Sequence, residues 1–194
     1  MGHKTLLICG SMKPSPGRDT KSAARELLNL VKKKFDEQGY DNYKVLDLRN
    51  LNLPFFDGRN TSEYENESVD ELYNSMLEAE HIIISAPAYW KSVVGSVINA
   101  MNVIGGPLYD FPEKKKLLVG KKVSLIVVGA EFADAVHGSS QLRNVFTAMG
   151  ATVLRKEIII GNLRTLSVKE QGKLVTDLFK LGESIATKSG EYAV

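Results

Sequence analysis

The apolar run at residues 81–85 is the feature that most constrains how this chain folds. Ile82, Ile83 and Ile84 are consecutive β-branched residues, a pattern typical of a strand buried on both faces of a parallel sheet. A break follows at residues 85–92, and residues 93–102 can then continue as a helix. The break falls at the carboxyl end of the strand, where open α/β sheets bind their ligands.

Apolar runs and helical patterns alternate along the rest of the chain. Four more strands are predicted at residues 5–9, 44–48, 122–128 and 152–160. Apolar residues at helical spacing lie between the strands: Leu27, Leu28, Val31 and Phe35; Val69, Leu72, Tyr73, Met76 and Leu77; and Leu142, Val145, Phe146 and Met149. This alternation predicts one α/β domain over residues 1–194, with a polar tail after about residue 188. We expect a five-stranded parallel sheet in the order 2-1-3-4-5, with helices on both faces.

Capping signals indicate where several helices begin and end. A capping box from Ser167 to Glu170 opens the last helix, near residues 167–186. Its inward side chains are expected to be Leu174, Val175, Leu178, Phe179 and Ile185. Ser68 with Glu71 is a similar signal before the second helix, and Gly150 can terminate the fourth.

Composition excludes several classes of protein. The chain of 194 residues has 25 basic and 23 acidic residues, a balance too even to argue for nucleic acid or an anionic membrane as partner. No apolar stretch reaches the roughly 18 residues that span a bilayer. The single Cys9 lies within an apolar strand and has no second cysteine to pair with. We therefore expect a buried thiol and a cytoplasmic location.

Residues 10–22, between the first strand and the first helix, suit a phosphate. Ser11, Ser15, Thr20 and Ser22 supply hydroxyls just before a helix N-terminus, whose free N–H groups and dipole favour an anion. The alternative is that Asp19 or Thr20 only caps the helix. The loop matches neither G-x-x-x-x-G-K-[ST] nor G-x-G-x-x-G, so the patterns of P-loop ATPases and dinucleotide-binding folds are missing.

Two further loops are predicted at the same edge of the sheet. Residues 85–92 carry Tyr89 and Trp90, and residues 129–142 follow the fourth strand. A phosphate loop after strand one and flat-ring loops after strands three and four predict a mononucleotide site. The alternative for the two aromatic residues is packing at a subunit interface. A homodimer or homotetramer is expected from the apolar side chains at this rim, Tyr89, Trp90, Val93, Val94 and Val97.

Five motifs, in order, resemble the NADPH-dependent FMN reductases, a flavodoxin-like family that includes NAD(P)H:quinone and azo-dye reductases. The best match is Pro-Ala-Tyr-Trp-Lys-Ser-Val-Val-Gly at residues 87–95, which is similar to the family's Pro-x-Tyr-x-x-Ser-x-Pro-Gly. The others are Gly-Ser-Met-Lys at 10–13 with Arg-Asp-Thr at 18–20, Leu-Pro-Phe-Phe-Asp at 53–57, Gly-Lys-Lys-Val at 120–123, and Gly138 with Gln-Leu-Arg at 141–143. The resemblance spans about residues 4–160.

The resemblance implies which residues bind FMN. Ser11, Lys13, Arg18 and Thr20 would hold its phosphate. The ring would be lined by Pro87, Ala88, Tyr89, Trp90, Lys91 and Ser92, and main-chain N–H groups of Gly129, Ala130 and Glu131 would approach its pyrimidine edge. The chemistry implied is hydride transfer from NADPH or NADH through FMN to a quinone, azo compound, flavin or similar small acceptor. It needs neither a catalytic side chain nor a metal ion.

Two alternatives from other classes stay open. The first is a one-electron flavodoxin carrier, a class that is usually strongly acidic, unlike this chain. The second is a cofactor-free binding protein of the same fold. Lys13 stands where the family usually has Arg, Val94 where it has Pro, and Asn99 and Asn102 where it has Lys and Asp.

Overall fold

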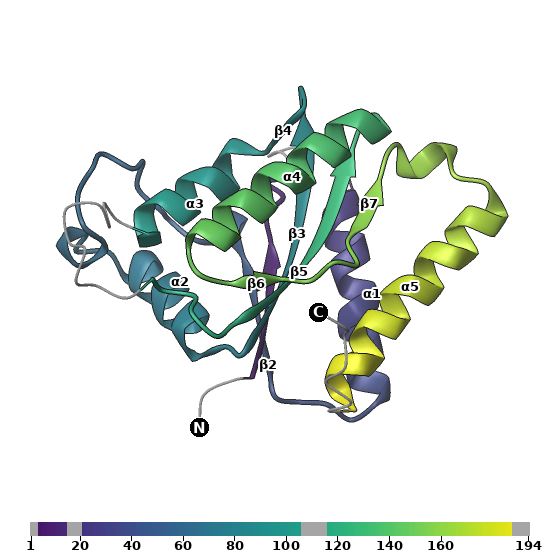
Figure 1. The fold of residues 1–194 in the computed structure, drawn as a ribbon, viewed down its shortest axis with the longest axis horizontal. Helices are drawn as coiled ribbons and strands as arrows, with labels where there is room; N and C mark the ends of the chain where they lie inside the picture. The colour runs from purple at the N-terminus through teal and green to yellow at the C-terminus, as the bar shows by residue number, and fades with distance from the viewer. Residues whose placement is uncertain (1–3, 15–20, 106–115, 188–194) are drawn as a thin grey trace.

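The computed structural model describes residues 4–14, 21–105 and 116–187. Helices flank both faces of a twisted, mainly parallel sheet (Figure 1). The strands are β1 (Thr5–Cys9), β2 (Tyr43–Asp47), β3 (His81–Tyr89), β4 (Ser92–Val93), β5 (Lys122–Gly129), β6 (Thr152–Val153) and β7 (Ile158–Ile160). The helices are α1 (Ala23–Glu37), α2 (Glu67–Glu78), α3 (Gly95–Gly105), α4 (Phe132–Ala148) and α5 (Val168–Ala186), with short 3-10 turns at Leu48–Asn50, Thr61–Glu63 and Leu163–Thr165.

The sheet has the order β2-β1-β3-β5-β6, with β7 also paired to β5. β5 corresponds to the predicted fourth strand, and β6 and β7 together correspond to the fifth. The observed order therefore confirms the predicted order 2-1-3-4-5. β4 is an addition, because it pairs antiparallel with the end of β3. The carboxyl ends of β1, β3, β5 and β7 therefore meet at one edge of the sheet.

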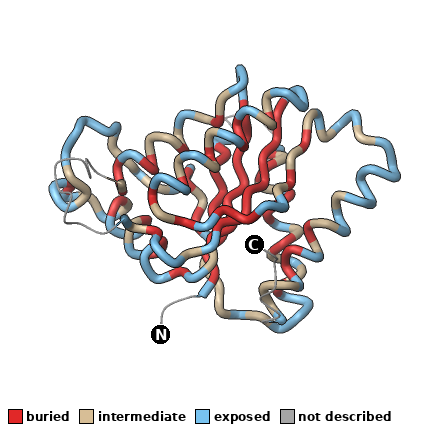
Figure 2. Tube along the Cα trace, in the orientation of Figure 1, coloured by how far each residue is buried: buried red, intermediate tan, exposed pale blue. Residues whose placement is uncertain are grey.

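Alternating side chains divide the core into two layers. Leu6 and Ile8 of β1 pack in a cluster with α2, α3 and α4, whereas Leu7 and Cys9 pack with α1 and α5. Figure 2 shows the buried residues concentrated in the central strands.

Cys9 is buried and free, and burial raises the pKa of its thiol. No helix within the described ranges is long and apolar enough to cross a membrane.

The predicted strand at 152–160 is wrong, because it is two strands. Between β6 and β7 the chain turns, and the carboxylate of Glu157 accepts hydrogen bonds from Ser139 and Arg143 of α4. Arg143 also donates to the carbonyl oxygens of Val153 and Leu154, at 3.1 and 2.7 Å. These polar contacts with α4 replace strand pairing where the apolar pattern alone predicts continuity.

Several helix predictions also need correction. Ser22, not Asp19 or Thr20, is the N-cap of α1. Asn66 rather than Ser68 caps α2, because its side chain accepts from the N–H groups of Ser68 and Val69. The Ser167–Glu170 capping box at α5 is confirmed. Leu77 and Val175, both predicted to face inward, are exposed.

Candidate functional site

The segment at 85–92, predicted to be a loop, is mostly strand. β3 continues to Tyr89, turns at Trp90 and Lys91, and returns as β4, with Ala88 paired to Val93. The φ angles of Trp90 and Lys91 are 54° and 58°, as a two-residue type I′ hairpin turn requires. No other non-glycine residue in the described ranges has a positive φ.

Helix α4 fixes this hairpin in place. The side-chain oxygen of Gln141 accepts from the Ser92 hydroxyl and from the Val93 N–H, both at 3.0 Å. Asp134 accepts from the N–H of Lys91 at 2.9 Å. Most of residues 129–142, predicted as a loop, is thus the first half of α4.

Gly138 lets α4 lie directly against the hairpin. A Cβ at this position would be 2.7 Å from the Cβ of Ala88, closer than real Cβ contacts allow. The Gly138 and Gln141 motif in the sequence therefore has a structural explanation: it docks α4 on the end of β3.

The first loop is held close to the sheet. The N–H of Gly10 donates to the carbonyl of Ser85 at 2.8 Å, and Ser11 is only 2% exposed. The Ser11 hydroxyl oxygen accepts from the N–H of Lys13 at 3.3 Å, which leaves the hydroxyl proton for another acceptor. Arg18 and Thr20, two of the predicted phosphate ligands, lie outside the described residues.

A pocket of about 320 Å³ opens at the carboxyl edge of the sheet. It lies between the first loop, the start of α1, the ends of β3 and β5, and the turn after β7. Its lining residues are Ser11, Lys13, Lys21, Ser22, Ala23, Ala24, Pro87, Tyr89, Val128, Gly129, Ala130, Asn162, Leu163 and Arg164. Of the residues predicted for the site, this pocket brings together Ser11, Lys13, Pro87, Tyr89, Gly129 and Ala130.

Other predicted residues are placed elsewhere. Strand alternation turns Ala88 to the α4 side, where it is fully buried. Trp90 is at the hairpin tip and is 94% exposed. Lys91 shares that tip, Ser92 bonds to Gln141, and Glu131 precedes the first turn of α4.

Sequence reasoning missed part of the lining. Lys21, Asn162 and Arg164 all line the pocket. Asn162 and Arg164 follow the last strand, so a search of every strand's carboxyl end would have found them. The N–H of Arg164 donates to the Asn162 side chain at 3.0 Å, which orders this turn.

The pocket is electropositive. Lys13, Lys21 and Arg164 line it, and its described lining contains no acidic side chain. Within the described ranges, none of these three cationic groups is in a salt bridge. Such cations beside a helix N-terminus form a site for an anion.

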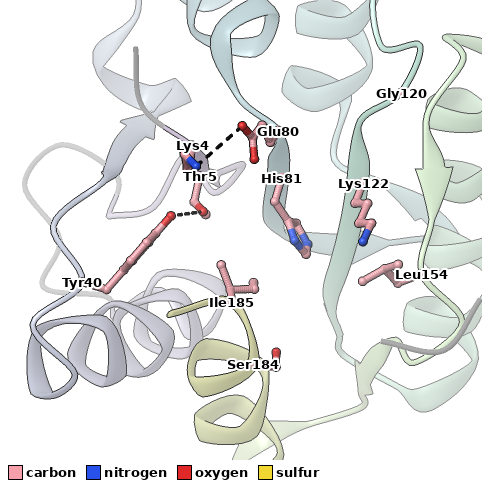
Figure 3. Close-up of a pocket in the computed structure, with 10 residues that line it drawn as sticks. All are labelled: Lys4, Thr5, Tyr40, Glu80, His81, Gly120, Lys122, Leu154, Ser184 and Ile185. Carbon is pink, nitrogen blue, oxygen red and sulfur yellow. Dashed lines mark hydrogen bonds and ion pairs between the residues drawn. The ribbon is translucent and has the colours of Figure 1, made fainter. Parts of the chain in front are cut away.

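A larger hollow of about 490 Å³ lies at the opposite, amino edge of the sheet (Figure 3). Its polar groups mostly bond to one another. Thr5 bonds to the Tyr40 hydroxyl at 2.9 Å, and Lys4 is 4.0 Å from Glu80.

His81, on β3, is the titratable group at the centre of this amino-edge hollow. Its Nε2 is 2.9 Å from the hydroxyl oxygen of Ser124. Burial, with a smaller contribution from Lys122, lowers the pKa of His81 to about 4. His81 is thus a neutral, hydrogen-bonded group at pH 7, as expected for a structural histidine.

The apolar rim predicted beside the site is smaller than expected. Val93 and Val97 are 3% and 0% exposed and belong to the core beneath α3. Val94 is partly buried against the same core. Tyr89 and Trp90 remain exposed, with Phe132 at the start of α4 62% exposed as well.

A parallel sheet with a cationic pocket at its carboxyl edge has the arrangement in which open α/β proteins bind their ligands. The sequence profile of the NADPH-dependent FMN reductases matches residues 3–164. The chain belongs to this family, and it is an oxidoreductase.

Solved structures agree on the fold. The flavoenzyme NAD(P)H:(acceptor) oxidoreductase FerB from Paracoccus denitrificans is 16% identical, with a TM-score of 0.68 over 95% of this chain and 96% of that one. An FMN-dependent NADH-azoreductase from Bacillus anthracis, solved with FMN, is 15% identical, with a TM-score of 0.65 over 95% and 100%. An oxidoreductase from Corynebacterium diphtheriae is 12% identical, with a TM-score of 0.69 over 96% and 97%. At these identities the likeness shows the flavodoxin-like fold.

Proposed function

We propose that this protein binds FMN and transfers hydride from NADPH or NADH to a quinone, azo compound, flavin or similar small acceptor. The observation that carries the proposal is the carboxyl-edge pocket, which combines cations and hydroxyls with an apolar and aromatic wall. FerB is named for NAD(P)H and a general acceptor, and the Bacillus anthracis structure contains FMN.

The described residues fit the phosphate of FMN. Ser11 has a hydroxyl proton to donate, and Lys13 and Lys21 supply positive charge at the start of α1. Hydrogen bonds to a charged group are stronger than those between neutral groups. Arg18 and Thr20 remain predicted phosphate ligands.

The other wall of the pocket fits the flat ring. Pro87 and Tyr89 of β3 offer apolar and aromatic surface, and Gly129 and Ala130 bring main chain to the pocket. When bound, FMN supplies the hydride chemistry. The protein binds and orients it, and no side chain is proposed as an acid, base or nucleophile. Contacts of the ring with Ala88, Trp90, Lys91, Ser92 and Glu131 stay predictions.

Flavin titration and NAD(P)H oxidation test this proposal. The apo-protein should bind FMN more tightly than FAD, because the phosphate loop ends against α1 and leaves little room for an adenylate. The FMN complex should oxidise NADPH or NADH when benzoquinone or an azo dye is added. Absence of FMN binding would contradict the proposal. FMN binding without NAD(P)H oxidation would instead indicate a one-electron carrier.

We also propose a cytoplasmic homodimer or homotetramer with the pocket near the subunit boundary. Trp90 and Phe132 expose large apolar surfaces beside the site, which a second copy would cover. The buried free Cys9 is consistent with a reducing compartment. Sedimentation at micromolar concentration tests the assembly, and a species of 21.4 kDa alone would contradict it.

A further inference from the structure

Arg25, in the first turn of α1, joins three separate segments of the chain. Its guanidinium donates to the carbonyl oxygen of Ser11 at 3.1 Å and to that of Lys13. Through Nε and Nη2 it also donates to one carboxylate oxygen of Asp47, at 2.9 and 2.7 Å. One side chain thus ties the first loop to α1 and to the end of β2.

These contacts leave Arg25 little capacity to bind an anion itself. All three nitrogens of the guanidinium are already donating to protein oxygens. Its charge is compensated by Asp47, and the two side chains are 23% and 17% exposed. Arg25 is also not among the residues that line the pocket. It therefore acts on the loop, not on a ligand.

The contacts set the direction of the loop's peptide groups. Carbonyl oxygens carry partial negative charge and would repel a phosphate, but those of Ser11 and Lys13 are turned toward Arg25. The peptide bond between Ser11 and Met12 is trans, so the N–H of Met12 points away from the guanidinium. Ser11 and Lys13, whose carbonyl oxygens accept hydrogen bonds from Arg25, also line the pocket.

We propose that Arg25 and Asp47 are positioning residues that hold the carbonyl oxygens of Ser11 and Lys13 away from the phosphate of FMN, so that the side chains of these two residues face it. This inference rests on the proposed function. It differs from a general stabilising role because it concerns the phosphate alone. Riboflavin, which has the same ring without a phosphate, is therefore the comparison ligand.

The experiment measures the dissociation constants of FMN and riboflavin by flavin fluorescence in the wild type, Arg25→Gln and Asp47→Asn. The wild type should prefer FMN. The ratio of the riboflavin to the FMN dissociation constant should fall at least about fivefold in Arg25→Gln and about threefold in Asp47→Asn, with riboflavin affinity unchanged. Asp47→Asn keeps the shape of the side chain, so it guards against a folding defect in the arginine variant.

Arg25→Lys separates geometry from charge. A lysine keeps the positive charge but cannot fork between Asp47 and two carbonyls. If Arg25 acts by positioning, this variant should resemble Arg25→Gln. A wild-type preference for FMN in Arg25→Lys would mean that charge alone matters and would overturn the proposal.

Arg49→Gln is the matched control. Arg49 is exposed and near Asp47 in sequence, and its main-chain N–H, not its guanidinium, donates to Asp47. The Arg49→Gln variant loses the same charge as Arg25→Gln but no contact with the first loop. Its preference for FMN over riboflavin should therefore equal that of the wild type.

Three further results would overturn the inference. An unchanged preference in Arg25→Gln would mean that the loop needs no such support. An equal loss of both ligands would mean a general structural role. A wild type that binds riboflavin and FMN equally would remove the phosphate site itself, and the proposed function would then fail first.

Discussion

The two edges of the sheet carry hollows of similar size but opposite character. At the amino edge, a hollow of about 490 Å³ is lined by polar groups that mostly bond to other protein groups, such as His81 to Ser124. At the carboxyl edge, about 320 Å³ is lined by Lys13, Lys21 and Arg164, for which the described residues provide no ion pair. Of these two, the amino-edge hollow is the larger. Because its cations have no ion-pair partner among the described residues, the carboxyl-edge pocket is the candidate binding site.

Backbone strain follows the same division. The described non-glycine residues with positive φ are Trp90 and Lys91, both at the tip of the carboxyl-edge hairpin. A left-handed conformation costs such residues roughly 1–2 kcal/mol each. Strain of this kind is retained where the surrounding structure imposes it, and it concentrates at functional sites. The contrast between the two hollows predicts that replacing His81 at the amino edge changes stability, whereas replacing residues that line the carboxyl-edge pocket changes ligand binding.

The largest expected effect is at the amino edge, where His81 should make the protein sensitive to acid. The pKa of His81 is about 4 in the folded protein, against an ordinary value of 6.5 for histidine, so the unfolded chain takes up the proton first. Stability contributed by the neutral side chain is complete above pH 6.5 and falls as the pH decreases toward 4. The loss is on the order of 3 kcal/mol, from about 1.36 kcal/mol for each pKa unit.

Denaturant unfolding of His81→Gln between pH 7 and pH 4 measures this effect. Glutamine does not titrate, so the variant should lack that part of the acid destabilisation while FMN affinity at pH 7 stays unchanged. His137→Gln is the control, because His137 is exposed on α4 and should keep the wild-type pH profile. If His81→Gln and the wild type lose stability in parallel, the assignment of acid sensitivity to His81 is wrong.

The next effect is at the carboxyl edge. Ser11→Ala removes a hydroxyl that can donate to the phosphate, a bond on the order of 1.5–3 kcal/mol when the partner is charged. FMN affinity, measured by fluorescence titration, should fall at least about tenfold, while thermal unfolding changes little. Ser184→Ala, which removes a hydroxyl from the amino-edge hollow, is the matched control and should bind FMN like the wild type. Equal affinities in all three proteins would move the phosphate site elsewhere.

Much of the fold could be predicted because its signals are local. The triple isoleucine in β3 and the apolar stripes of the helices record burial directly in the sequence. The division between β6 and β7 could not be read this way, since it depends on Arg143 reaching Glu157 from another element. Val175 fits the helical stripe yet remains exposed, because periodicity does not show where the neighbouring surface ends.

The candidate site was predictable only in part, for similar reasons. The first loop precedes a helix at a strand end, so Ser11 could be found from its position, whereas Lys13 was assigned through the family resemblance. The hairpin was missed because its turn is Trp-Lys, whereas type I′ turns usually carry Asn-Gly. Arg164 reaches the pocket only because β7 pairs with β5, a tertiary fact.

The strain at the hairpin predicts a smaller effect, in the stabilising direction. Lys91 has a φ of 58°, and glycine adopts this conformation without a Cβ penalty. Glycine also makes the unfolded chain more flexible, which offsets part of this gain. The free energy of unfolding of Lys91→Gly, measured with denaturant, should therefore be roughly 0.5–1 kcal/mol higher than that of the wild type. Lys91→Ala keeps the Cβ and should gain nothing. A destabilised Lys91→Gly variant would show that the turn is not strained.

The smallest effect expected is that of a single exposed cation, Arg164. Its side chain lines the carboxyl-edge pocket without an ion-pair partner among the described residues, so its contribution to binding an anion is long-range and screened by solvent. Arg164→Gln should weaken FMN binding by about two- to fivefold at an ionic strength of about 0.01 M, and the difference should nearly vanish at about 1 M salt. Lys122→Gln removes an equivalent charge from the amino-edge hollow and should have no effect at either salt concentration. If both variants weaken binding equally, the whole protein attracts FMN by its net charge. The contrast between the two edges would then lie in hydrogen bonding alone.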